Sequence, residues 1–130
     1  MVGGEQILIV DDNFTNLKLV EYVLDRRGYR VLTAADAEEA LRLLGRHQPD
    51  LILMDLQLPG VDGFELTHRL KSDPATRDIV VVAITSYAMK GDRERALAVG
   101  CDGYIAKPID TRALPGLVQS FLDGARGPAG

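Results

Sequence analysis

Short apolar runs alternate with segments of helical periodicity along the chain, and this alternation constrains the fold more than any other feature. The apolar runs occupy residues 6–10, 30–34, 51–54, 79–85 and 103–106. Apolar residues at helical spacing follow each run, in segments 14–27, 37–46, 64–71, 88–99 and 111–122. Strands with so little polar alternation, each followed by a helix, predict a parallel sheet covered on both faces. We therefore expect a doubly wound α/β fold with right-handed crossovers.

Local signals mark the ends of several predicted helices. Gly28 is a suitable stop for the first helix. Asp36, with Glu39 three residues later, resembles a capping box at the start of the second. Pro115 and Gly116 come early in the last helix, where proline removes a backbone donor and glycine weakens the turn. We expect that helix to begin irregularly or to kink there.

Length and charge exclude several classes of protein. The 130 residues fit one domain, which we place at residues 6–123 between a short extension at 1–5 and a tail at 124–130. A net charge of −4 argues against a nucleic-acid surface, and no apolar run is long enough to span a membrane. Cys101 is the single cysteine, which fits a reducing cytoplasm, and we expect it to be a small buried residue.

Polar residues follow four of the five predicted strands. Asp11 and Asp12 follow the first run, Asp55 the third, and Lys107 the fifth, while Thr85 ends the fourth. Ligands bind at the carboxyl ends of parallel strands, where the strand order reverses. With the order 2-1-3-4-5, the three acids meet at that point and the second strand, which ends in small neutral residues, lies at the edge.

Each of these residues also has an ordinary structural explanation. Asp12 or Asn13 could simply cap the first helix, Asp55 could be a solvated strand end, Thr85 could cap a turn and Lys107 could be surface charge. Their joint placement favours a site. Three carboxylates without histidine or cysteine suit Mg²⁺, with Mn²⁺ as a substitute, rather than zinc. A carboxylate can also attack phosphorus to form an acyl phosphate.

These residues resemble the response-regulator receiver (CheY-like) domains of two-component signalling. The similarity extends from about Gln6 to Leu122. It depends on the motifs ILIVDDN (7–13), LILMDLQLPGVDG (51–63) and ITSYAMKGDRERALAVGCDGYIAKPID (84–110) and on their spacing. The resemblance implies a flavodoxin-like (βα)5 fold, with residues 6–123 as the receiver domain.

The resemblance also implies roles for the clustered residues. It makes Asp55 the acceptor of a phosphoryl group from a phosphohistidine on a histidine kinase or histidine phosphotransferase. It implies Mg²⁺ bound by Asp12, Asp55 and the backbone carbonyl of Gln57, with Asp11 acting mainly through water. Lys107 becomes the counter-ion of the phosphoryl group, and its peptide bond to Pro108 is expected to be cis.

A switch is the second implication of the resemblance. Thr85 would move toward the phosphoryl group, and Tyr104 would turn into the vacated space. Tyr104 also has the simpler explanation of a half-buried strand aromatic. The output face for a protein partner would be formed by the fourth helix, fifth strand and fifth helix. Gln57 and Tyr87 occupy positions that modulate loss of the phosphoryl group.

Within the family, the chain resembles stand-alone regulators of the DivK type, which are signalling domains rather than enzymes. A receiver from a hybrid histidine kinase or larger regulator, and a receiver that serves as an unphosphorylated scaffold, are the alternatives. A dehalogenase-type phosphatase is disfavoured because Gln57 stands where that class needs an acid. A flavodoxin is disfavoured because Asp11 and Asp12 would repel a phosphate. His47 and His68 stand alone and are expected to be surface or half-buried residues rather than phosphoryl donors.

Overall fold

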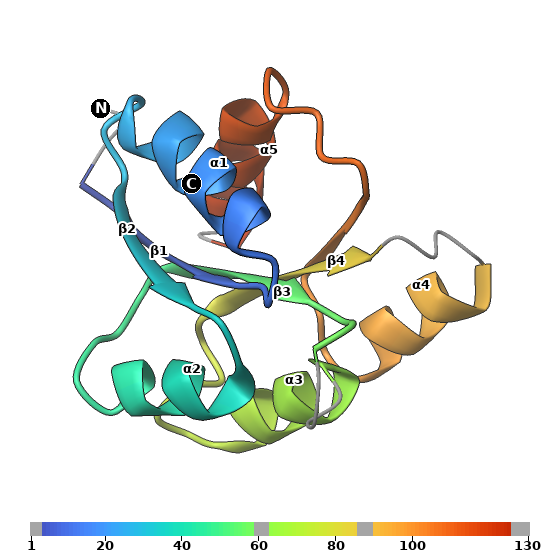
Figure 1. The fold of residues 1–130 in the computed structure, drawn as a ribbon. Coiled ribbons are helices and arrows are strands. Elements are labelled where there is room, and N and C mark those ends of the chain that lie inside the picture. The colour runs from blue at the N-terminus through green and yellow to red at the C-terminus, as the bar shows by residue number, and fades with distance from the viewer. Residues whose placement is uncertain (1–3, 59–62, 86–89, 126–130) are drawn as a thin grey trace.

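The apolar runs form a parallel sheet in a computed structural model of the protein, which describes residues 4–58, 63–85 and 90–125. The strands are β1 (Gln6–Val10), β2 (Arg30–Ala34), β3 (Leu51–Asp55), β4 (Val80–Thr85) and β5 (Gly103–Ala106). They are hydrogen-bonded in the order β2-β1-β3-β4-β5, and each neighbouring pair is parallel (Figure 1). The predicted strand order is confirmed.

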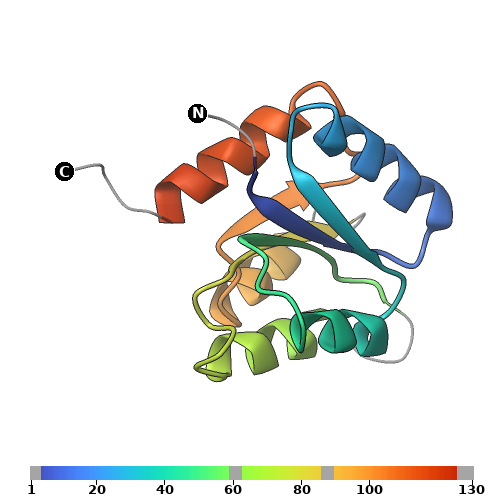
Figure 2. The same ribbon diagram turned by 90° about the vertical axis from the view of Figure 1, so that its left-hand side faces the viewer.

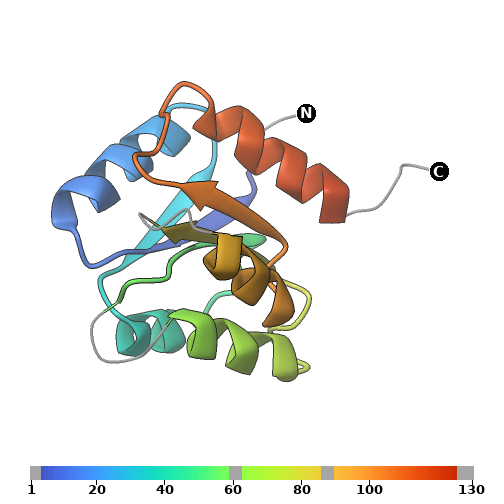
Figure 3. The ribbon, with the colours of Figure 1, turned by 90° about the vertical axis from the view of Figure 1, so that its right-hand side faces the viewer.

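Helices cover both faces of this sheet. They are α1 (Phe14–Asp25), α2 (Ala37–Leu44), α3 (Gly63–Ser72), α4 (Lys90–Ala98) and α5 (Leu114–Ala125). Figures 2 and 3 show α1 and α5 together on one face, with α2, α3 and α4 on the other. This arrangement confirms the doubly wound, flavodoxin-like fold. Within the described residues, no helix is of a length and apolarity that would let it cross a membrane.

Two separate apolar cores explain why the central strands lack polar alternation. Ile7 and Ile9 of β1 pack against α1 and α5, whereas Leu8 and Val10 pack on the opposite face with α2 and α3. Every residue of β3 and β4 is buried in the same two-sided way. A strand buried on both faces has no solvent side to carry polar residues. Cys101 is buried, as expected, and this burial raises the pKa of its thiol to about 11.

The predicted cap of α2 is present in the structure. The Asp36 side chain accepts from the backbone N–H of Glu39 at 2.8 Å, and the Glu39 carboxylate accepts from the N–H of Ala35 at 2.7 Å. Helix α1 is capped by Asn13, whose side chain accepts from the N–H of Asn16 at 3.0 Å. It ends at Asp25, two residues before the predicted end, and the following turn closes at Gly28, which has a φ of 94°.

Helix α5 begins three residues later than the helical pattern predicts. The Asp110 side chain accepts from the backbone N–H groups of Arg112 and Ala113, which holds the predicted first turn outside the helix. Pro115 is the second residue of α5. Proline is tolerated there because first-turn N–H groups have no partner within the helix. The predicted start at residue 111 is wrong, and Pro115 lies in the first turn of a helix that begins at Leu114.

Candidate functional site

The carboxyl ends of the central strands bring the predicted polar residues to one edge of the sheet. Strand β1 ends at Val10 and is followed by Asp11, while Asp55 is the last residue of β3. Because β1 and β3 are hydrogen-bonded neighbours, these two acids follow adjacent strand ends. The strand order reverses at this point, which is where open parallel sheets bind their ligands.

Three carboxylates gather at this edge. One oxygen from each of Asp11, Asp12 and Asp55 lies within 4.8 Å of the others. Asp11 and Asp55 are buried, with 4% and 1% of their surface exposed, whereas Asp12 is exposed. Like charges this close disfavour one another's ionised form unless a cation balances them. The cluster therefore has the electrostatic character of a cation-binding site.

Lys107 brings one positive charge to the cluster from the end of β5. Its Nζ lies 3.1 Å from Oδ2 of Asp55 and 3.9 Å from Oδ2 of Asp11. Its backbone N–H donates to the carbonyl oxygen of Thr85 at 2.8 Å, and the peptide bond to Pro108 is cis, as expected. Among the side chains that the structure describes, one ammonium faces three carboxylates, so negative charge is in excess there.

Backbone amides orient the two buried carboxylates. The N–H of Asn13 donates to Oδ1 of Asp11, and the N–H of Gln57 donates to Oδ1 of Asp55, each at 2.9 Å. In both acids the other oxygen, Oδ2, faces Lys107. Each carboxylate is therefore held between a backbone donor two residues ahead and a lysine from a distant strand.

Burial raises the pKa of the Asp11 carboxyl above its ordinary value of 3.8. The neighbouring Asp55 raises it further, by charge repulsion and by sharing a hydrogen bond, while the N–H of Asn13 and the Lys107 ammonium lower it. The raised pKa means that ionising Asp11 costs free energy in the metal-free protein. A bound cation would relieve this cost.

Of the other predicted site residues, three belong to the described part of the chain and one does not. Thr85 is the last residue of β4 and is 2% exposed. Tyr104 lies in β5, is half-buried, and packs against the apolar core on the α2–α3 face. Gln57 is half-buried. Tyr87 lies outside the described residues.

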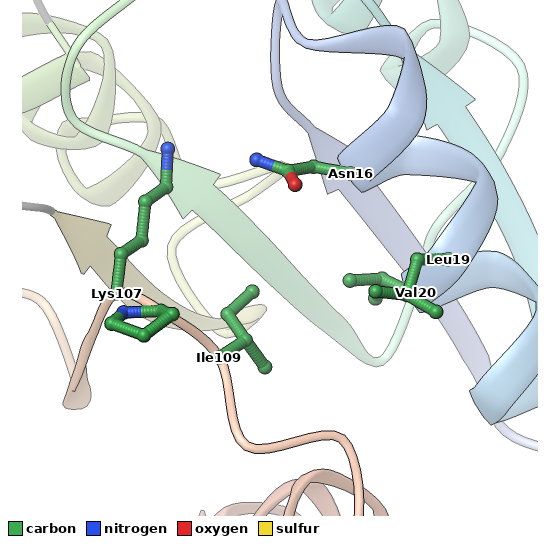
Figure 4. Close-up of a pocket in the computed structure, with 6 residues that line it drawn as sticks. Asn16, Leu19, Val20, Lys107 and Ile109 are labelled. Carbon is green, nitrogen blue, oxygen red and sulfur yellow. The ribbon is translucent and has the colours of Figure 1, made fainter.

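A pocket beside Lys107 was not predicted from the sequence. It has a volume of about 460 Å³ and is lined by Asn16, Leu19, Val20, Lys107, Pro108 and Ile109. Figure 4 shows Asn16 of α1 and Lys107 on opposite sides of its opening, with apolar side chains below them. The helical spacing of Asn16, Leu19 and Val20, which places them on one side of α1, was the only hint of this pocket in the sequence. It gave no indication of pairing with the loop after β5.

The donor set fits Mg²⁺. The clustered ligands are carboxylate oxygens, and within the described residues neither histidine nor cysteine belongs to the group. Mg²⁺ prefers oxygen ligands and retains several waters, which the exposed position of Asp12 would accommodate. Asp11, Asp12 and Asp55 are the described residues whose side-chain oxygens lie close enough together to hold such an ion.

Fold and site together define a class of protein: a doubly wound α/β domain with an acidic cluster and a lysine at its switch point. A family model described as the response regulator receiver domain matches residues 7–119. The chain therefore belongs to the response regulator receiver family of two-component signalling.

Individual relatives agree with this assignment. The chain is 44% identical to the polar-differentiation response regulator DivK of Brucella anthropi, over 93% of this chain and 98% of that protein. A CheY-like receiver from Methanospirillum hungatei has a TM-score of 0.86 and 31% identity, over 94% of this chain and 96% of that one.

The receiver of a sensor histidine kinase from Pseudomonas aeruginosa, solved with a magnesium ion in its active-site cleft, has a TM-score of 0.83. It is 36% identical, over 94% of this chain and 99% of that one.

Proposed function

We propose that the protein is a stand-alone response regulator whose Asp55 accepts a phosphoryl group from a phosphohistidine, in a Mg²⁺-dependent reaction. The observation that carries this proposal is the position of Asp55, which is buried at the end of β3, close to two other carboxylates and 3.1 Å from Nζ of Lys107. Family membership and the similarity to DivK support it.

Asp55 is the acceptor in this proposal. A carboxylate oxygen of Asp55 forms a bond to phosphorus as the bond from phosphorus to the donor imidazole nitrogen breaks, and the electron pair stays on that nitrogen. The N–H of Gln57 orients the carboxylate, and the Lys107 ammonium draws the incoming phosphoryl oxygens toward it. Such transfers depend mainly on positioning and charge neutralisation.

Asp11 and Asp12 prepare the site for the metal. When bound, Mg²⁺ would neutralise negative charge on the carboxylates and on the phosphoryl oxygens. Asp12, Asp55 and the carbonyl of Gln57 would hold the ion directly, and Asp11 would hold its water ligands. Mn²⁺ has similar ligand preferences and would substitute.

The pocket beside Lys107 provides the approach for the donor protein. It opens between α1 and the loop after β5, and its apolar lining includes Leu19, Pro108 and Ile109. Leu19 and Phe14 on α1 are large and exposed, at 47% and 70%. A histidine kinase or phosphotransferase that presents its phosphohistidine to Asp55 would cover this region.

The proposed output is a change in the face formed by α4, β5 and α5. Thr85 is the last residue of β4, the neighbour of β3, and its hydroxyl would donate to the phosphoryl group, with Tyr104 turning inward in response. Leu97 of α4 and Leu117 of α5 are exposed apolar side chains that a protein partner would cover. Gln57 and Tyr87 would control access of hydrolytic water to the phosphoryl group.

The domain assignment and cellular setting are part of the proposal. Residues 6–123 form the receiver, and we place the protein in the cytoplasm, with no nucleic-acid partner and signalling rather than catalytic activity. The match to 98% of DivK supports a stand-alone regulator. The similarity to a histidine-kinase receiver keeps a hybrid-kinase origin as the alternative.

The first test is intact-protein mass after incubation with acetyl phosphate. We expect one added phosphoryl group in the presence of Mg²⁺, and none with EDTA or in Asp55→Asn. A folded wild-type protein that gains no phosphoryl group from acetyl phosphate or from a phosphorylated histidine phosphotransferase would favour the scaffold alternative. Addition that persists in Asp55→Asn would show a different acceptor.

A further inference from the structure

The part of helix α4 whose side chains the structure describes, residues 94–98, buries little apolar surface. From Glu94 to Ala98, Ala96 is buried, whereas Leu97 is 52% exposed. The sequence predicts a solvated face at Arg93, Glu94 and Arg95, and Glu94 and Arg95 are exposed in the structure. Contacts other than core packing therefore matter for the position of this segment.

One such contact joins Arg95 of α4 to Phe64 of α3. The guanidinium carbon of Arg95 lies 4.1 Å from the centre of the Phe64 ring, within the range of a cation–π interaction. The ring is 8% exposed and belongs to the apolar core, so its position is well defined. Figure 3 shows α4 beside α3 on the same face of the sheet.

The start of α3 presses against the end of β3. A Cβ atom added at Gly63 would lie 2.7 Å from Cα of Leu56 and 2.8 Å from the carbonyl oxygen of Asp55, closer than real Cβ contacts. The hydroxyl of Thr67 donates to the Gly63 carbonyl at 2.8 Å and fixes this turn. Because no space separates the two segments, a displacement of Phe64 is passed to Leu56.

Leu56 leads directly to the proposed phosphoacceptor. Its N–H donates to the carbonyl oxygen of Ile84 at 3.0 Å, and the next N–H, from Gln57, donates to Oδ1 of Asp55 at 2.9 Å. The position of the Gln57 amide therefore helps to set the orientation of the Asp55 carboxylate. Contacts run without a gap from α4 to that carboxylate.

We propose that Arg95 is a positioning residue for Asp55, acting through Phe64, Gly63 and the Leu56–Gln57 backbone. The coupling is reciprocal: a group bound at Asp55 shifts α4 through the same contacts. This route passes through α3 and is separate from Thr85 and Tyr104. Its functional meaning rests on the proposed phosphoacceptor role of Asp55, but its physical basis is tested without phosphorylation.

The first experiment measures amide chemical shifts by NMR in the metal-free protein. Arg95→Met keeps the apolar stem and removes the charge, Arg95→Lys keeps a cation, and Arg69→Met removes an exposed arginine of α3 that lines a different groove. We expect Arg95→Met to move the Leu56 and Gln57 amide signals. Arg95→Lys should move them less, and Arg69→Met should leave them in place.

Unchanged Leu56 and Gln57 signals in a folded Arg95→Met protein would overturn the proposal, as would equal changes in Arg69→Met. Should Arg95→Met fail to fold, Phe64→Leu breaks the same stack from the other side and must move the same two signals.

A second experiment measures the rate of phosphorylation by acetyl phosphate. We expect Arg95→Met to slow it about fivefold and Arg95→Lys to restore most of the rate. A rate equal to wild type in Arg95→Met would contradict the positioning role. If the wild-type protein itself accepts no phosphoryl group, the proposed function fails, and the amide signals still decide whether α4 is coupled to Asp55.

Discussion

Two lysine–aspartate pairs lie at opposite ends of the same sheet, and they differ in how completely their charges are balanced. Near the amino ends of the strands, Lys71 of α3 lies 2.8 Å from Asp102. Lys71 also donates to the carbonyl oxygens of Arg77 and Ile79, and Asp102 accepts from the N–H of Val81. One cation meets one acid there, and both make further hydrogen bonds.

The carboxyl ends of the strands present the opposite balance. Lys107 lies 3.1 Å from Asp55 and 3.9 Å from Asp11, and Asp12 has an oxygen within the same small cluster. Among the described side chains negative charge is in excess, and burial raises the pKa of Asp11. A pair with balanced charges can have a purely structural role. Buried charge in excess destabilises the folded protein, and such an arrangement is typical of a functional site.

The largest expected effect comes from removing the lysine of the unbalanced cluster. We expect Lys107→Met to slow phosphorylation by acetyl phosphate about 100-fold, because a positioned cation stabilises the charge that develops during transfer. Intact mass followed over time measures the rate. Lys71→Met is the matched control and should phosphorylate at the wild-type rate; a similar loss in both variants would erase the distinction between the two pairs.

Removing the lysine of the balanced pair should act on stability instead. We expect Lys71→Met to lower the free energy of unfolding by about 2 kcal/mol, because two carbonyl oxygens and the Asp102 carboxylate lose a donor. Urea denaturation followed by circular dichroism measures this change. A Lys71→Met protein as stable as wild type would show that this pair is dispensable.

Neutralising one acid of the unbalanced cluster should stabilise the metal-free protein. Asp11→Asn keeps an oxygen that can accept from Asn13 but removes a buried charge, and we expect a gain of about 1 kcal/mol in EDTA. The folded-state pKa of Asp11 is raised, so below about pH 3.8 this carboxyl does not lower the stability of the wild-type protein. The loss of stability appears as the pH rises through that raised pKa.

The advantage of Asp11→Asn should therefore grow between acidic and neutral pH in urea unfolding series. An advantage that shrinks over that interval would contradict the assigned direction of the pKa. Added Mg²⁺ should reduce the difference by stabilising the wild-type protein more.

The smallest effect is expected at a third pair, on the exposed flank of α1. Lys18 lies 3.6 Å from Glu21, and its side chain is 62% exposed. Such pairs contribute little, because water screens them. Lys18→Met should change the free energy of unfolding by less than about 0.5 kcal/mol and leave the acetyl-phosphate rate unchanged. A larger change in stability would show that exposure alone does not separate the three pairs.

Sequence reasoning reached the unbalanced cluster but not the balanced pair, for a physical reason. The cluster follows strand ends, and the positions of Asp11 and Asp55 follow from the parallel topology alone. The Lys71 side chain reaches from the end of α3 to Asp102 in the loop before β5. No sequence periodicity predicts that contact. Arg95 is similar: its exposure was predictable, whereas its stacking on Phe64 depends on how two helices pack.

The boundaries of the helices were likewise predicted in some places and missed in others. Asp36 and Glu39 identified the start of α2 because a cap is a local interaction between residues close in sequence. The start of α5 was placed too early because the helical pattern continues back through residues 111–113, where the Asp110 side chain holds a turn instead. Apolar spacing locates a helix, but competing side-chain bonds set its first residue.

The hydrogen bond between Asn13 and Asp11 has a consequence for how this chain tolerates insertions and deletions. Asn13 caps α1 with its side chain while its backbone N–H holds the Asp11 carboxylate. Each of the three residues between β1 and α1 therefore has a fixed position relative to the strand and the helix. Adding or removing one residue between Val10 and Phe14 would lose the helix cap and turn the carboxylate away in a single step. Length variation in relatives of this chain should consequently avoid this junction and collect in other loops.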